Sequence, residues 1–342
     1  MSEMIYKELL EKMLRKENLS SEEAAKMMDL IISKEITSTQ TGALLIALRA
    51  KGEAPEEISG AATTLLEKAV KVNVKKEVLV DTCGTGGDML KTFNISTIVA
   101  IICAAGGVPI AKHGNKSISS ESGSADLLAE LGVKIELSPE KVQQCIEEVN
   151  IGFIFAPAFH TAMKNVAPVR RELKTRTLFN LLGPLINPAL PTHQLIGVYD
   201  ENLLGIIAQA LKKLGRKKAM VVHGSGADEL CTWGINKVAL LDEDGKINEF
   251  AFSPEEVGIK RSNLNEVKGG KPKENAIIAL RILNGEKGPK RDIVLLNAGA
   301  VFMIAGKTKT IKEGIEFAAE IVDSGKAKQK LKELIELTRE MN

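Results

Sequence analysis

From residue 78 onward, short apolar runs alternate with helical segments. The apolar run 78–80 leads through a glycine loop into the apolar helical segment 98–105, and the run 108–111 follows it. The other expected extended segments are 133–135, 153–155, 195–199, 219–222 and a hairpin made of 238–241 and 247–250. Strands that alternate with helices form a mostly parallel sheet with helices on both faces. The sequence therefore predicts an α/β fold.

The first seventy residues contain only helical patterns. Ser20 and Glu23 have the spacing of a capping box, and the apolar residues that follow recur at helical intervals. A second helical stretch, interrupted by prolines, breaks the alternation at about 165–190. We therefore expect a small helical domain of residues 1–70, joined by about 165–190. Residues 71–342 are expected to form a larger α/β domain that this insertion interrupts.

The overall charge and the cysteines exclude several classes of protein. Lys and Arg number 46 against 44 Asp and Glu, so the formal charge of +2 gives no support to a nucleic-acid coat or a membrane-surface role. No apolar run reaches the ~20 residues that span a bilayer, and the acidic start does not resemble a signal peptide. The four cysteines lack the spacing of a zinc ribbon or a disulfide scaffold. The expected location is the cytoplasm, with no nucleic-acid or membrane partner.

A glycine-rich loop follows the first expected strand. It reads Gly-Thr-Gly-Gly-Asp at 84–88, so three of four successive positions are glycine. Glycines let backbone N–H groups approach a ligand closely, and such nests favour anions. The loop has neither the Walker nor the Rossmann spacing. Taken alone, it is equally compatible with a tight turn between a strand and a helix.

Two more polar segments are expected beside this loop. Asn94, Ser96 and Thr97 stand where a helix begins, and free N–H groups at a helix start favour phosphate. The segment 112–120 follows the second expected strand and contains two lysines, an amide and three serines, and Ser124 lies at the start of the next helix. Loops that follow parallel strands gather at one edge of the sheet. Together they predict a ligand with more than one phosphate.

Carboxylates and cations elsewhere in the chain complete the candidate site. Asp228 and Glu229 offer adjacent oxygen ligands suited to Mg²⁺, although a solvated acidic turn would look the same. Arg170 is suited to holding a carboxylate, the alternative being a surface ion pair. His113 and His160 are candidates to line a pocket, but a lone histidine is more often structural.

Five motifs in this order resemble the anthranilate phosphoribosyltransferases. They are GTGGD at 84–88, KTFNIST at 91–97, KHGN at 112–115, SGSADLLAELGV at 122–133 and FNLLGPLINP at 179–188. The resemblance implies a helical domain and an α/β domain of the nucleoside phosphorylase/phosphoribosyltransferase class II type, and a homodimer formed through the helical domain. It implies transfer of the phosphoribosyl group of phosphoribosyl pyrophosphate (PRPP) to the amine of anthranilate, with release of pyrophosphate. This is a magnesium-dependent step of tryptophan biosynthesis, with two ions per subunit.

The resemblance also assigns residues to ligands. For PRPP these are Gly84, Gly87, Asp88, Thr92, Asn94, Ile95, Ser96, Thr97, Lys112, His113, Gly114, Asn115, Lys116, Ser117, Ile118, Ser119, Ser120 and Ser124. For anthranilate they are Gly84, Asn115, Arg170, His113 and His160, and for magnesium Ser96, Asp228 and Glu229. Lys112, Asp228 and Glu229 would act electrostatically, and no residue acts as an acid or base. Three features depart from the family pattern: Thr161, Ile186, and a spacer of three residues, one fewer than expected, before Asp228.

Two other functions are compatible with this fold. A nucleic-acid-binding relative without transferase activity should have a basic groove and a degraded acceptor site. The near-neutral charge and the presence of only three Trp and Tyr residues argue against nucleic-acid binding, and the intact Asn115 and Arg170 argue against a degraded acceptor site. A pyrimidine nucleoside phosphorylase should have a longer lysine-serine-glycine-arginine signature at the phosphate loop, where this chain reads KHGN. The transferase is the expected function.

Overall fold

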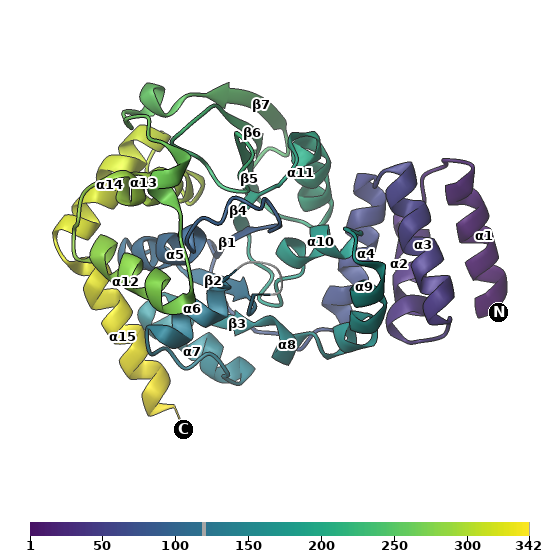
Figure 1. Cartoon of the computed structure of the whole chain (residues 1–342). Coiled ribbons are helices and arrows are strands. Elements are labelled where there is room, and N and C mark those ends of the chain that lie inside the picture. Colours follow the sequence, from purple (N-terminus) through teal and green to yellow (C-terminus); the bar gives the residue numbers. More distant parts are fainter. Residues whose placement is uncertain (118–120, 342) are drawn as a thin grey trace.

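The computed structural model describes residues 1–117 and 121–341, and its centre is a seven-stranded sheet (Figure 1). The strands are β1 (Val80–Gly84), β2 (Ile110–Gly114), β3 (Ile151–Phe155), β4 (His193–Gly197), β5 (Lys218–Gly224), β6 (Asn236–Leu241) and β7 (Ile247–Phe252). Their order is β3-β2-β1-β4-β5-β6-β7. The first five strands are parallel, and β6 and β7 add an antiparallel hairpin. The predicted α/β fold is therefore confirmed.

Helices cover both faces of the sheet. They are α5 (Ile95–Ala105), α6 (Ser124–Glu130), α7 (Pro139–Val149), α8 (Ala156–Phe159), α11 (Leu204–Lys213), α12 (Pro272–Leu283), α13 (Pro289–Ile304), α14 (Ile311–Asp323) and α15 (Lys326–Glu340). On β4, Leu195 faces a core shared with α5, α13 and α14, whereas Ile196 faces a second core shared with α11. Both side chains are at most 4% exposed, so successive residues of the strand are buried on opposite faces.

Four helices form a separate bundle at the N-terminal end: α1 (Ser2–Leu14), α2 (Ser21–Ile32), α3 (Ser38–Lys51) and α4 (Pro55–Lys68). The expected capping box is present, because Ser20 and Glu23 exchange side-chain-to-backbone hydrogen bonds at the start of α2. Residues far along the chain pack against this bundle. They form short helices at Thr161–Asn165, Ala167–Leu173 (α9), Phe179–Leu182 (α10) and Gly183–Leu185.

Two contacts join this insertion to the bundle. The amide of Asn165 donates to the carbonyl of Ile32 over 2.7 Å, and Leu173 on α9 lies 3.7 Å from where a Cβ of Gly42 on α3 would be. The insertion also reaches the sheet, since Gln194 on β4 donates to the carbonyl of Pro184 over 2.9 Å. It therefore connects the helical bundle with the sheet.

The segment 133–135, expected to be extended, is not a strand of the sheet. The N–H of Val133 donates to the carbonyl of Leu128, which closes the end of α6, and the N–H of Lys134 donates to the hydroxyl of Thr338 on α15. Its backbone groups are therefore occupied by neighbouring helices. The prediction was wrong because a short segment with two apolar residues packs equally well beneath a helix.

In the part of the chain that is described, no helix is both long and apolar enough to cross a membrane.

Candidate functional site

The site lies where the parallel strands end. Gly84, Gly197 and Gly224 are the last residues of β1, β4 and β5, and the segment that contains Asp228 and Glu229 passes directly against them. A Cβ on Gly197 would lie 1.5 Å from the carbonyl oxygen of Asp228, and one on Gly224 would lie 2.4 Å from that of Glu229. Only glycine leaves room for this close approach. Asp228, 142 residues beyond Gly86, is thereby brought onto the glycine loop.

The three-residue spacer before Asp228 forms a tight turn. Gly224 and Ala227 exchange two backbone hydrogen bonds of 3.0 Å, and the two residues between them, Ser225 and Gly226, both have positive φ. His223 supports the turn, because its Nδ1 donates to the carbonyl of Val198 while its Nε2 accepts from the N–H of Gly226. The short spacer therefore still delivers the acidic pair to the strand ends.

Asp88 and Glu229 lie close enough to Asp228 for the charges of the three carboxylates to interact, although the described side chains do not converge on one point. The N–H of Gly86 donates to Asp228 Oδ2 over 2.6 Å, and Asp88 lies beside Asp228. Burial, and then the charge of Asp88, raise the pKa of Asp228 to about 7. Burial, and then the charge of Asp228, raise the pKa of Glu229 well above its usual value. Such a cluster stabilises a bound cation, because the cation removes the repulsion between the carboxylates.

The donor set fits magnesium that is shared with a substrate. Among residues 1–117 and 121–341, no three His, Cys, Asp or Glu side chains form a group that could hold a metal ion. Mg²⁺ is usually held by one or two carboxylates, with substrate phosphates completing its shell. Asp88 Oδ2 is buried and makes no hydrogen bond within the described residues, so one carboxylate oxygen remains available. The acidic cluster thus suits an ion that arrives with a phosphate ligand.

The first turn of α5 faces the same edge of the sheet. Asn94 is its N-cap residue, and Ser96 and Thr97 lie in the first turn, as the sequence predicted. Thr97 Oγ1 is buried and has no partner in the described part of the chain. The ammonium of Lys112, only 3% exposed, donates to the carbonyl of Thr82 over 2.5 Å and lies 3.4 Å from Ser96 Oγ. A buried cation beside the N-terminus of a helix is a suitable environment for phosphate.

The loop after β2 is tied to the start of α6. Asp126 accepts from the N–H groups of Ser117 and Gly123, both over 2.9 Å, and Ser124 Oγ lies 3.4 Å from the carbonyl of Asn115. The candidate Gly114 is the last residue of β2, and Lys116 and Ser117 lie on this loop. Ile118, Ser119 and Ser120 lie outside the described residues.

Two other PRPP candidates have structural contacts of their own. The side chain of Ile95 is 1% exposed in the hydrophobic core, so only its main chain is left to contact a ligand. Thr92 pairs with Lys268 in an isolated antiparallel bridge. The loop that carries Thr92 is therefore held from the C-terminal part of the chain, which the sequence did not predict.

The two candidate histidines form a buried pair. The rings of His113 and His160 are edge to face, with centroids 5.2 Å apart, and both residues are at most 7% exposed. Burial, and then the neighbouring His160, lower the pKa of His113 to about 3, and burial lowers that of His160 to about 4. Both rings are therefore neutral near pH 7. Their Nε2 atoms have no partner among the described residues, as expected of groups that await a ligand.

Two arginines lie on the insertion. Arg170 lies on α9 with its guanidinium 5.5 Å from the centre of the Phe179 ring, and burial lowers its pKa. Arg176 was not among the predicted site residues, yet it donates to the carbonyl of Gly87 and lies 3.8 Å from the centre of the Tyr199 ring. Its position beside Arg170 in the sequence gave no indication of this contact.

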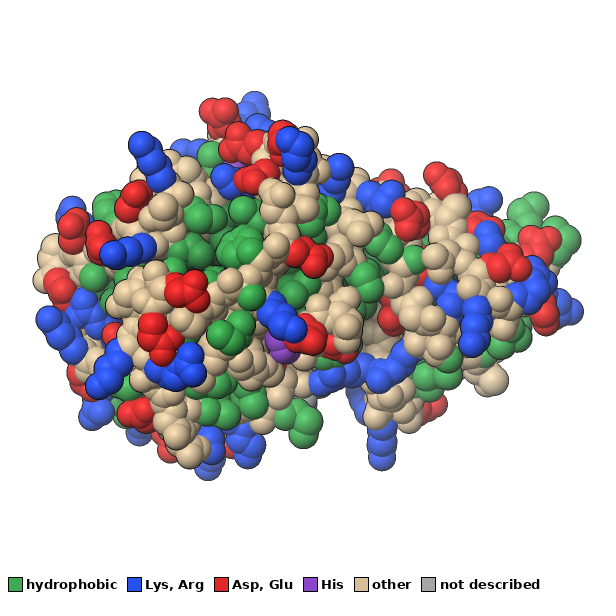
Figure 2. Space-filling model, turned by 90° about the horizontal axis from the view of Figure 1, so that it is seen from above, with side chains coloured by type: hydrophobic (Ala, Val, Ile, Leu, Met, Phe, Trp, Pro, Cys, Tyr) green, Lys and Arg blue, Asp and Glu red, His purple; other side chains and the backbone are tan. Residues whose placement is uncertain are grey.

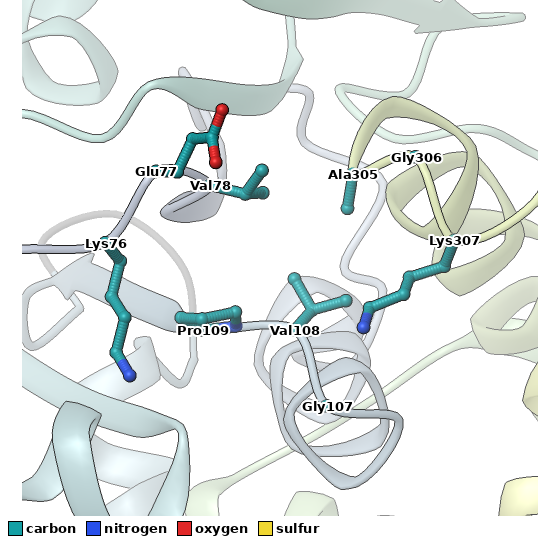
Figure 3. A pocket seen from close by; sticks show the side chains of 9 residues that line it. All are labelled: Lys76, Glu77, Val78, Gly107, Val108, Pro109, Ala305, Gly306 and Lys307. Atoms are coloured by element: carbon teal, nitrogen blue, oxygen red, sulfur yellow. The ribbon is translucent and has the colours of Figure 1, made fainter.

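A cavity of about 320 Å³ lies at the opposite end of the strands (Figure 3). Its lining includes Val78 before β1, Val108 and Pro109 before β2, and Lys307 after α13, whose side chains surround it in the figure. None of the candidate site residues lines this cavity.

Comparisons with known proteins show the family of this chain. Residues 7–69 match the family described as "Glycosyl transferase family, helical bundle domain", and residues 76–328 match "Glycosyl transferase family, a/b domain". An anthranilate phosphoribosyltransferase of Petrotoga mobilis is 51% identical over 330 residues, which cover 96% of each chain.

Solved structures show the same likeness. The crystal structure of anthranilate phosphoribosyltransferase from Thermus thermophilus is 46% identical, with a TM-score of 0.92 over 97% of this chain and 99% of that chain. The enzyme of Saccharomyces cerevisiae, in complex with PRPP and Mg, is 29% identical, with a TM-score of 0.88 over 98% of both chains. A further structure of the yeast enzyme contains 4-fluoroanthranilate (27% identity, TM-score 0.88, 99% of both chains). A chain that shares half of its residues with such an enzyme over nearly its whole length, and that folds as they do, belongs to the anthranilate phosphoribosyltransferase family.

Proposed function

We propose that this protein transfers the phosphoribosyl group of PRPP to the amine of anthranilate, giving N-(5-phosphoribosyl)anthranilate and pyrophosphate, as a step of tryptophan biosynthesis. The observation that carries the proposal is that Asp228 lies on the glycine loop with Asp88 and Glu229 beside it, next to Lys112 and the first turn of α5. A pyrophosphate that brings its own magnesium would satisfy both the carboxylates, through the metal, and the cationic start of α5, through its phosphate oxygens.

PRPP would bind along the edge formed by β1, α5 and β2. The N–H groups of the glycine loop and of the first turn of α5 are suited to its phosphates, and Ser96 and Thr97 offer hydroxyls. Ser96, Asp228 and Glu229 would hold the magnesium, with two ions per subunit. When bound, the magnesium would supply positive charge to the leaving pyrophosphate. Lys112 would add a fixed charge that needs no reorganisation during the reaction.

The reaction needs little acid or base chemistry from the protein. The bond between ribose C1 and a pyrophosphate oxygen breaks, the anthranilate nitrogen forms a bond to C1, and the nitrogen loses a proton. An aromatic amine is already neutral at pH 7, so it requires orientation more than activation. The neutral pair His113 and His160 would line the acceptor pocket with Gly84 and Asn115, and Arg170 would hold the carboxylate. These roles explain why no catalytic dyad is needed.

We also propose the assembly and location of the protein. The helical domain would comprise residues 1–70 and about 165–190, and the α/β domain the remainder of 71–342. A homodimer would form through the helical domain, because Met4 and Leu14 on α1 are each 61% exposed and hydrophobic side chains emerge at that end of the molecule (Figure 2). Light scattering after gel filtration gives the mass directly. A cytoplasmic location is consistent with four free cysteines.

The test is the fluorescence of anthranilate in the presence of PRPP and Mg²⁺, with each component omitted in turn. Loss of fluorescence only in the complete mixture, with one pyrophosphate released per anthranilate consumed, is the expected result. No loss across a range of temperatures and magnesium concentrations would contradict the proposal. Phosphorolysis of pyrimidine nucleosides and an electrophoretic shift of DNA, measured on the same preparation, test the two alternative functions.

A further inference from the structure

A segment that begins α12 clamps one of the loops of the proposed PRPP site. This segment, residues 268–275 and here called the α12 clamp, lies almost two hundred residues beyond the loop 91–94 that it contacts. Lys268 pairs with Thr92 in an antiparallel bridge, and the N–H of Gly269 donates to the carbonyl of Lys91 over 2.9 Å. A Cβ on Gly269 would lie 2.6 Å from Phe93 Cα, so the approach requires glycine.

Asn275 connects the clamp to the N-cap of α5. It is 2% exposed, its Oδ1 accepts from the N–H of Gly270 over 2.8 Å, and its Nδ2 donates to Asn94 Oδ1 over 3.0 Å. Both ends of a buried amide are therefore used, and the orientation of the amide is fixed by its two partners.

Asn94 in turn joins two loops of the site. Its Oδ1 accepts from Ser122 Oγ over 3.1 Å as well as from Asn275, and its Nδ2 donates to the carbonyl of Ser122 over 2.9 Å. Although it is the N-cap residue of α5, its side chain makes no capping hydrogen bond. The contacts instead tie the start of α5 to the segment that leads into α6.

We propose that Asn275 is a positioning residue for PRPP: it holds the amide of Asn94 and so keeps the start of α5 and the loop before α6 in the geometry that binds the phosphates. This inference rests on the proposed function. Asn275 is buried and its amide is bonded to Gly270 and Asn94, so it would act on the substrate only through Asn94. Its removal should weaken PRPP binding more than anthranilate binding.

The test uses Asn275→Asp, which keeps the size of the side chain and its acceptor for Gly270 but cannot donate to Asn94 when ionised. We expect the KM for PRPP to rise about tenfold, equivalent to about 1.4 kcal/mol. The KM for anthranilate at saturating PRPP should stay within about twofold, since that part of the site is not held by the clamp. Asn284→Asp, the same chemical change at the exposed C-terminal end of α12, is the matched control and should leave both constants unchanged.

A double-mutant cycle with Asn94→Ala separates positioning from a simple effect of charge. If Asn275 acts through Asn94, Asn275→Asp should change the KM for PRPP less than about twofold in the Asn94→Ala background. An equal tenfold rise in both backgrounds would overturn the proposal. Asn275→Ala, which introduces no charge, should reproduce the loss of PRPP affinity, and its melting temperature shows whether the fold survives.

Calorimetric titration of the wild-type protein with PRPP and Mg²⁺ distinguishes failure of this inference from failure of the proposed function. If the wild-type protein does not bind PRPP, the proposed function fails. If it binds PRPP and Asn275→Asp binds PRPP equally well, only the role of Asn275 is refuted.

Discussion

One added methyl group at the end of β4 should dismantle the acidic site. In Gly197→Ala, the new Cβ would lie 1.5 Å from the carbonyl oxygen of Asp228 and 2.1 Å from its carbonyl carbon. Real Cβ atoms do not approach such atoms within 3.0 Å, so the main chain at Asp228 must move by about 1.5 Å or more. Because the clash is with backbone, no change of side-chain rotamer can relieve it.

The displacement removes the carboxylates from the glycine loop. The hydrogen bond of 2.6 Å between the N–H of Gly86 and Asp228 Oδ2 is broken, and the acidic pair no longer faces the pyrophosphate. A misplacement of about 1 Å can reduce catalysis about 100-fold. We therefore expect kcat/KM for PRPP to fall at least ~100-fold, with a higher magnesium concentration needed for half-maximal rate. The assay is the loss of anthranilate fluorescence at a series of magnesium concentrations.

Two other glycine substitutions serve as references for the size of this loss. In Gly84→Ala the new Cβ would lie 2.3 Å from Asp228 Oδ2 but 3.1 Å from the backbone oxygen of Asp228. Only the carboxylate of Asp228 must then leave its place, and the main chain that carries Glu229 stays nearly where it is, so the loss should be smaller than in Gly197→Ala. In Gly42→Ala, on α3, the nearest atom is 3.7 Å away, and the helix gains about 1 kcal/mol from alanine. That variant should be fully active. Wild-type activity and magnesium dependence in a folded Gly197→Ala protein would refute the reasoning.

Four further predictions test the proposed roles. Arg170→Ala should raise the KM for anthranilate about 30-fold or more, because a charge-assisted pair of hydrogen bonds to the carboxylate is lost. An equal loss of PRPP affinity in binding titrations would contradict the assignment of Arg170 to anthranilate. Asp228→Asn with Glu229→Gln should slow turnover and weaken its dependence on magnesium. In the wild type the apparent magnesium affinity should rise from pH 5 to 8, because the pKa of Asp228 is raised to about 7 and the ion requires the ionised carboxylate. Reaction rates measured against magnesium concentration at each pH test this, and an affinity that does not rise would count against the site. The pKa of His113 is lowered to about 3, so the stability that its neutral form gives is present above pH 6.5 and is lost as the pH falls below that value. The free energy of unfolding of the wild type, measured with denaturant, should therefore fall between pH 7 and pH 5 by about 2 kcal/mol more than that of His113→Gln.

Much of the fold could be predicted because it depends on neighbouring residues. Short apolar runs that alternate with helical patterns specify parallel strands, and the strands at 80–84, 110–114, 151–155, 193–197 and 218–224 fall at or beside the expected runs. The hairpin around Asp244 and the capping box at Ser20 were found for the same reason, since each requires only a few adjacent side chains. The run 133–135 failed because its backbone partners belong to α6 and α15.

The sequence by itself determined the fold class, the glycine loop at the end of β1 and the helix start that follows it. Only the tertiary structure decided which distant residues complete the site: Asp228 meets Gly86, Arg176 meets Gly87, and Asn275 holds Asn94. These partners are separated by 142, 89 and 181 residues. Local propensity cannot specify such pairs, because they depend on strand register and on how closely one segment crosses another, and both are set by packing around the whole sheet.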